Sequence, residues 1–187
     1  MAISLKLAAP PSDEEILKLS ERNPGYQFER TDAGELVVTA VGAESGWREL
    51  ELGAQLRNWA VEDSRGIAFS PSTGFHLSDG SLLLPDASWL RRDRWEALTA
   101  EQRRGLAPLC PEAVFEIVSP SDSLASLRRK MRSYLANGAR LAVLVDPERR
   151  AVEIYAPDRE PQILDSPQSV SFDPVLPGFT LDLERIF

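Results

Sequence analysis

The chain has 187 residues, a hydrophobic content of 43% and a formal net charge of −8. This length suits one globular domain, and no run of about 18 apolar residues is present to form a membrane-spanning helix. A single cysteine excludes an internal disulfide and a multi-cysteine zinc site, and a single histidine, His76, excludes metal centres with two or three histidines. We therefore expect a cytoplasmic protein, and residues 1–11 lack the features of a signal peptide.

The first third of the chain predicts a short helix, a hairpin and a long helix. Ser12, followed by three acidic residues, is typical of a helix N-terminus, and the sequence Asn-Pro-Gly at residues 23–25 ends that helix. Strands are predicted at residues 26–30 and 35–39, with a turn at residues 32–34 between them. Trp47, Leu50, Leu56 and Trp59 recur near helical spacing and predict a helix over residues 45–62.

The rest of the chain predicts a sheet with helices on its faces. Short strands are expected at residues 67–69, 74–77, 82–84 and 86–90, and helical character at residues 91–105. A buried strand at residues 113–118, a helix at residues 124–137 and an apolar strand at residues 141–145 should form a parallel, right-handed unit. A strand at residues 153–155 and two short strands within residues 170–187 complete a mixed α/β or α+β fold.

One carboxylate interrupts the apolar strand at residues 113–118. Because side chains alternate along a strand, Glu116 shares a face with Val114 and Val118. A buried charge is costly unless it is paired or binds a metal ion. A second acid, Asp86, begins another strand, and carboxylates on adjacent strands suit Mg²⁺ or Mn²⁺. The alternative interpretation is that Glu116 pairs with a helix arginine and Asp86 makes a turn.

The helix at residues 124–137 presents one of the chain's three lysines. Lys130 precedes Tyr134 by four residues, so the two share a helix face, whereas Arg129 and Arg132 are expected to point elsewhere. Lys130 could orient an attacking water or neutralise charge on a phosphate, or it could be one more solvated cation. His76 is expected to be structural.

Glu44 lies at the predicted start of the long helix. Its carboxylate could turn toward the same metal ion as Asp86 and Glu116. As an acid in the first helical turn, it would also simply complement the helix dipole.

Together these motifs resemble the Uma family of restriction-endonuclease-like proteins, in the PD-(D/E)XK nuclease superfamily. The resemblance is carried by Pro85-Asp86, Glu116, Ser119-Pro-Ser-Asp-Ser123 and Lys130-Met-Arg-Ser-Tyr134, with shorter matches at residues 72–75, 86–89, 94–95, 144–147, 152–155 and 176–179. It implies a central mixed sheet flanked by helices, preceded by an N-terminal helix and a β-hairpin. The expected organisation is one restriction-endonuclease-like domain over residues 1–187, with an N-terminal extension (1–23), a nuclease-like core (24–156) and a C-terminal loop with short strands (157–187).

The resemblance also implies a site. Asp86 and Glu116 would be metal ligands with Glu44 as a third acid, the ion would be Mg²⁺ or Mn²⁺, and the substrate would be DNA. The superfamily's lysine normally lies two residues after the second acid, where this chain has Val118. Lys130 would replace it from the neighbouring helix, with Tyr134 in support.

Three hypotheses therefore stand. The first is a metal-dependent DNA endonuclease with Asp86, Glu116 and Lys130 as catalytic residues, for which a two-fold homodimer would suit the cutting of both strands. The second is a catalytically inactive nuclease-fold module that binds DNA or protein, favoured by Val118 and by the acidic net charge. The third is a hydrolase of a small phosphorylated molecule. Residues 91–140 hold 10 Lys/Arg and 6 Asp/Glu, a local excess of +4 around the expected site.

Overall fold

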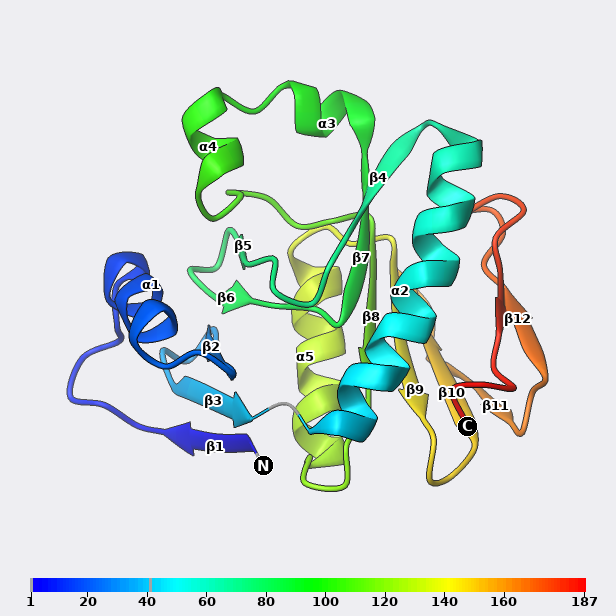
Figure 1. Cartoon of the computed structure of the whole chain (residues 1–187), viewed down its shortest axis with the longest axis horizontal. Helices are drawn as coiled ribbons and strands as arrows, with labels where there is room; N and C mark the ends of the chain where they lie inside the picture. Colours follow the sequence, from blue (N-terminus) through cyan, green and yellow to red (C-terminus); the bar gives the residue numbers. More distant parts are fainter. Residues whose placement is uncertain (1, 41) are drawn as a thin grey trace.

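The computed structural model describes residues 2–40 and 42–187, and it places helices on both faces of a central sheet (Figure 1). The helices are α1 (Asp13–Arg22), α2 (Ala43–Asp63), α3 (Arg92–Glu96), α4 (Ala100–Arg104) and α5 (Leu124–Ala136). The strands are β1 (Ala2–Leu5), β2 (Tyr26–Arg30), β3 (Leu36–Ala40), β4 (Gly66–Phe69), β5 (Phe75–His76), β6 (Leu82–Leu83), β7 (Ala87–Arg91), β8 (Ala113–Ile117), β9 (Leu141–Asp146), β10 (Ala151–Tyr155), β11 (Gln162–Asp165), β12 (Ser169–Ser171) and β13 (Thr180–Asp182).

The central sheet has six strands in the order β11-β10-β9-β8-β7-β4. Its pairs are antiparallel except β8 with β9, which are parallel with Glu116 opposite Leu144. The β8–α5–β9 crossover confirms the predicted parallel unit, and the mixed sheet flanked by helices confirms the expected fold class.

The alternation of β8 assigns its two faces to different layers. Phe115 packs in the core beneath α2, together with Leu52 and Leu56 of that helix. Val114 packs in the core beneath α5, together with Met131 and Tyr134. Glu116 is on the same face as Val114, so the fold directs its carboxylate toward α5.

A second sheet lies at the N-terminal side, in the order β1-β3-β2-β6-β5. One face of this sheet is apolar: Phe28 and Leu36 pack against Ile16 of α1. Ser12 caps α1 through a capping box, as the sequence predicts. The strand β1 was not predicted, because residues 1–11 combine apolar and turn-forming residues without a clear period.

Two other predictions differ in detail. The helical character of residues 91–105 divides into α3 and α4, because Thr99 begins a new helix with its own capping box. In α2, Leu56 is buried and Trp59 packs against the core as the spacing predicts, whereas Trp47 and Leu50 are 48% and 70% exposed. None of the described helices combines the length and the apolar character that a bilayer span requires.

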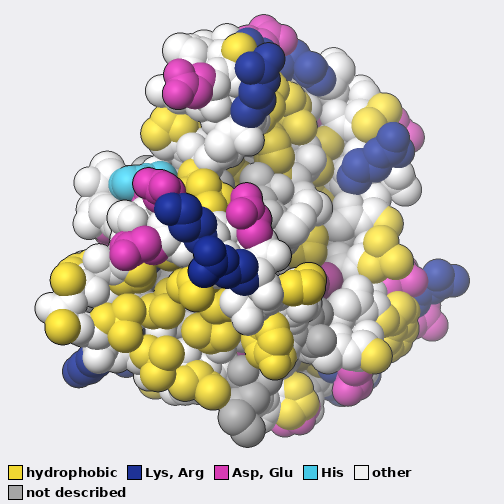
Figure 2. Space-filling model, turned by 60° about the vertical axis from the view of Figure 1, so that its left-hand side comes forward, with side chains coloured by type: hydrophobic (Ala, Val, Ile, Leu, Met, Phe, Trp, Pro, Cys, Tyr) yellow, Lys and Arg dark blue, Asp and Glu magenta, His cyan; other side chains and the backbone are white. Residues whose placement is uncertain are grey.

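Figure 2 shows hydrophobic side chains gathered over one part of the surface, and the exposed apolar residues include Ile3, Leu5 and Leu7 near the N-terminal sheet.

Candidate active site

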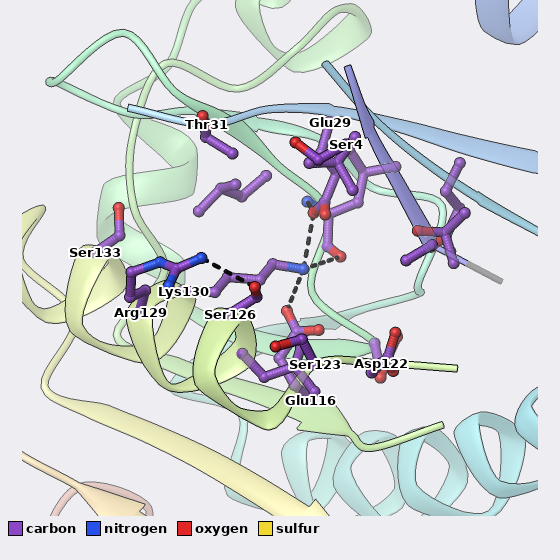
Figure 3. A pocket seen from close by; sticks show the side chains of 18 of the residues that line it. Ser4, Glu29, Thr31, Glu116, Asp122, Ser123, Ser126, Arg129, Lys130 and Ser133 are labelled. Carbon is purple, nitrogen blue, oxygen red and sulfur yellow. Dashed lines mark hydrogen bonds and ion pairs between the residues drawn. The ribbon is translucent and has the colours of Figure 1, made fainter. Parts of the chain in front are cut away.

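A cavity of about 900 Å³ lies between the polar face of the N-terminal sheet and helix α5. Strands β1, β2 and β3 form one wall, and the end of β8, the loop after it and α5 form the other (Figure 3). The charged side chains that line the cavity are eight acids (Glu29, Asp32, Glu35, Glu49, Asp79, Asp86, Glu116 and Asp122) and three bases (Arg129, Lys130 and Arg132). The cavity therefore contains a large excess of negative charge.

The side chain of Glu116 is only 5% exposed. Its Oε1 atom accepts a hydrogen bond from the Tyr134 hydroxyl at 2.9 Å and lies 2.8 Å from the Lys130 Nζ atom. Burial raises the pKa of Glu116 to about 7, although the ammonium of Lys130 acts to lower it. The expected lysine and tyrosine thus reach Glu116 from one helix face, and the partner is not an arginine.

Asp86 is the residue immediately before β7, and β7 is the strand next to β8 in the central sheet. Its Oδ2 atom accepts a hydrogen bond from the backbone N–H of Ile117 at 2.7 Å, which fixes the carboxylate beside the end of β8. Burial raises the pKa of Asp86 well above its usual value, and the negative charges of Glu116 and Glu49 raise it further. Asp86 and Glu116 therefore share one electrostatic environment, as expected for carboxylates on neighbouring strands.

Lys130 extends from α5 across the cavity (Figure 3). Its Nζ atom lies 2.8 Å from Glu116 Oε1 and 2.8 Å from Glu29 Oε1, and it donates a long hydrogen bond of 3.5 Å to the Leu84 carbonyl. Burial alone would lower the pKa of this ammonium, but the two carboxylates outweigh burial and raise the pKa. Lys130 is therefore a charged, partly buried group and not a solvated surface cation.

The structure does not bring Glu44 to this cavity. Its side chain is 63% exposed and forms an ion pair with Arg48 at 2.9 Å on the surface of α2. Glu49, five residues further along the same helix, lines the cavity instead, and burial raises the pKa of its carboxyl. Neither a motif nor a spacing in the sequence separates Glu49 and Glu29 from ordinary surface acids, so neither residue was predicted.

The rim of the cavity also differs from the prediction. Arg129 and Arg132 line the cavity, and Arg129 donates a hydrogen bond to the Ser126 hydroxyl at 2.9 Å. His76 lies outside this group: its Nδ1 atom is 2.5 Å from an oxygen of Asp13 in α1. The histidine thus joins α1 to the N-terminal sheet, in agreement with its expected structural role.

The donor set suits a hard divalent cation. Within the described residues, no group of three or more His, Cys, Asp or Glu side chains is arranged to hold a metal ion. Mg²⁺, however, is usually held by one or two carboxylates together with water and substrate phosphates. Asp86 and Glu116 supply two oxygen-donor side chains, and burial raises the pKa of each carboxyl.

Comparisons with known proteins agree with this fold. The model of a family described as "Uma2: Putative restriction endonuclease" matches residues 13–184. The chain is similar to a solved structure described as "a putative nuclease belonging to DUF820 from Anabaena variabilis ATCC 29413", with 19% identity over 95% of this chain and 98% of that chain and a TM-score of 0.76. A cryo-electron microscopy structure of a DrdV–DNA complex is similar over 61% of this chain and 9% of that chain, with 16% identity and a TM-score of 0.39, too low to support an argument. No curated protein matches.

Proposed function

The chain belongs to the Uma2 family, and from this membership and the cavity we propose that it is a divalent-metal-dependent nuclease that hydrolyses phosphodiester bonds in DNA. The observation that carries the proposal is the convergence of Asp86, Glu116 and Lys130 in one cavity. Lys130 pairs with Glu116 and Glu29, whereas the neighbouring Asp86 has a pKa raised by burial and by the charges of Glu116 and Glu49, and such perturbed groups in a cavity are typical of functional sites.

In this proposal each residue has a distinct task. Asp86 and Glu116 would hold Mg²⁺ or Mn²⁺, and the bound ion would supply positive charge that polarises the phosphate and favours deprotonation of water. Lys130 binds the scissile phosphate or the attacking water and neutralises the negative charge that develops on the phosphate. Tyr134 fixes the orientation of Glu116 through its hydroxyl, and the Ile117 N–H fixes Asp86. With Glu44 on the surface, we propose Glu49 as the third acid near the site.

The site must also accept an anionic substrate. The eight acids of the cavity oppose the approach of a phosphate, and the metal ion would have to offset much of this charge. Arg129 and Arg132, which line the cavity, would contact the sugar–phosphate backbone in this proposal. Binding should therefore weaken as the salt concentration increases.

The test is cleavage of plasmid, branched and single-stranded DNA with and without Mg²⁺ or Mn²⁺. We expect metal-dependent cutting by the wild type that is lost in Asp86→Asn and in Lys130→Met, and retained in Glu44→Gln. Cutting that survives Asp86→Asn and Lys130→Met would refute the assigned residues. A folded protein that cuts none of these substrates would favour the alternative, a nuclease-fold module that binds DNA or protein, for which Val118 in place of the usual lysine is the supporting observation.

A homodimer remains a prediction. Light scattering of the full chain in solution would decide it, and a nuclease that nicks one strand at a time would not require it.

A further inference from the structure

The ammonium of Lys130 is held by two carboxylates from two different sheets. Glu116 comes from β8 of the central sheet and Glu29 from β2 of the N-terminal sheet, and each places an Oε1 atom 2.8 Å from Nζ. The Leu84 carbonyl is the third acceptor at 3.5 Å. Because an ammonium has three N–H donors, these contacts use its full capacity. Lys130 is thus fixed from opposite sides of the cavity (Figure 3).

The position of Glu29 follows from the register of the N-terminal sheet. Glu29 lies opposite Val37 on β3, and alternation places it on the face that lines the cavity. Its neighbours Phe28 and Arg30 lie on the other face, where Phe28 packs with α1 and Arg30 pairs with Asp13 at 2.7 Å. Contacts on both faces therefore hold this strand in place.

A second contact fixes the carboxylate itself. Glu29 Oε1 accepts a hydrogen bond from the backbone N–H of Leu84 at 2.5 Å, in the segment that leads to Asp86. The Glu29 side chain is only 12% exposed. A carboxylate held in this way is a rigid anchor for a cation and not a mobile surface acid.

Glu116 cannot hold Lys130 equally well in every state of the site. The Glu116 oxygen that contacts Lys130 also accepts the Tyr134 hydrogen bond. If Glu116 binds a divalent cation, its charge is shared with that cation, and the cation repels the nearby ammonium. A lysine with Glu116 as its sole partner would then be free to move toward solvent.

We infer that Glu29 is a positioning residue that keeps Lys130 at the reacting phosphate when Glu116 is engaged by the metal ion, an inference that rests on the proposed function. This role of Glu29 also explains how the chain can have Val118 where the superfamily normally has its lysine. A lysine at position 118 would be fixed by its own strand, whereas a lysine on α5 needs an anchor on the opposite wall of the cavity. Glu29 makes the N-terminal sheet part of the catalytic unit.

Chemical labelling of amines tests this inference without relying on activity. The chain has three lysines, so peptide mass spectrometry can follow each one after brief acetylation of the folded full-length protein at pH 8. Lys6 and Lys18 have side chains that are 84% and 56% exposed and serve as internal references. In the wild type, we expect Lys130 to remain protected with and without Mn²⁺.

In Glu29→Gln, we expect Mn²⁺ to increase Lys130 labelling by roughly tenfold relative to the two reference lysines, because one charge-assisted contact is lost and the other is weakened. Glu29→Asp, which keeps the charge but shortens the reach, should give the same direction of change. Glu21→Gln, on the exposed surface of α1, is the matched control and should leave Lys130 protected.

Unchanged Lys130 protection in both Glu29 variants would overturn the inference. An equal rise at all three lysines would indicate general loosening and would also overturn it. In cleavage assays, a positioning role predicts a lower kcat with little change in KM. If the wild type cuts no DNA but the Glu29 variants show the predicted increase in Lys130 labelling, the nuclease proposal is refuted and the anchoring of Lys130 by Glu29 stands. The two failures are therefore distinguishable.

Discussion

Replacing Lys130 with methionine removes the cation that compensates Glu29 and Glu116 while keeping a side chain of similar length. The two carboxylates are 12% and 5% exposed, so neither can regain full solvation. Removing one member of a buried ion pair typically costs about 3–5 kcal/mol. In a domain of this size, 1 kcal/mol shifts Tm by about 2–4 °C, so we expect Lys130→Met to lower Tm by roughly 6–20 °C at pH 8.

The cost should depend on pH in a defined direction. The pKa of Glu116 is already raised from 4.5 to about 7, and loss of Lys130 raises it further. A carboxyl with a raised pKa in the folded state favours folding less as the pH rises from the unfolded value through the folded value. The Lys130→Met deficit should therefore be smaller near pH 5, where Glu116 is protonated in the folded variant, and larger at pH 8, where a growing fraction of Glu116 must ionise.

Urea and thermal unfolding followed by circular dichroism at pH 5 and pH 8 measure this effect. Lys18→Met is the matched control, because its ion pair with Glu14 is exposed and should contribute less than about 1 kcal/mol. The double variant Lys130→Met/Glu116→Gln should recover part of the loss. A Lys130→Met protein as stable as the wild type at pH 8, or equally destabilised at both pH values, would refute the reasoning.

Three further predictions concern single side chains of the same core. Burial and the charges of Glu116 and Glu49 raise the pKa of Asp86, so Asp86→Asn should increase the Tm of the metal-free protein at pH 8 and change it little at pH 4. The substitution should also abolish the Tm increase caused by Mn²⁺, and an undiminished Mn²⁺ response in scanning fluorimetry would contradict the assignment. Tyr134→Phe removes the 2.9 Å hydrogen bond to Glu116 and should cost about 1.5–3 kcal/mol in urea unfolding, with a negligible loss counting against the contact. Burial raises the pKa of the Cys110 thiol to about 12, so Ellman's reagent at pH 8 should react only after denaturation, and rapid reaction of the folded protein would show an accessible thiol.

Local periodicity was enough to predict part of the site. Alternation along residues 113–118 placed Glu116 on the face of Val114 and Val118, which α5 covers in the structure, and a spacing of four residues placed Lys130 and Tyr134 on one helix face. Both are short-range properties of a single element, and the structure agrees with them.

The choice between Glu44 and Glu49 could not be made in this way. Residues five positions apart on a helix point in directions about 140° apart, so only one of the two acids can face the cavity. Of the four apolar residues that predicted the helix, Leu56 is buried and Trp59 packs against the core, whereas Trp47 and Leu50 are exposed. The apolar pattern of the first two turns of α2 therefore did not indicate which acid faces the cavity.

Glu29 was beyond sequence reasoning for a different reason. Its role depends on the packing of the N-terminal sheet against α5, which brings together residues about a hundred positions apart. No local signal distinguishes Glu29 from an exposed hairpin acid. The packing of the N-terminal sheet against α5 is a tertiary contact, and the secondary-structure patterns of the sequence do not predict it.

Hydrolysis of bis(p-nitrophenyl) phosphate tests the central claim most directly, because this phosphodiester requires no knowledge of a DNA recognition sequence. With Mn²⁺ or Mg²⁺ present, the account predicts release of p-nitrophenol by the wild type and by Glu44→Gln, and none above background by Asp86→Asn, with all three proteins folded. Absence of release by the folded wild type at saturating metal, or release that Asp86→Asn preserves, would contradict the claim that Asp86 and Glu116 form a metal-dependent phosphodiesterase site.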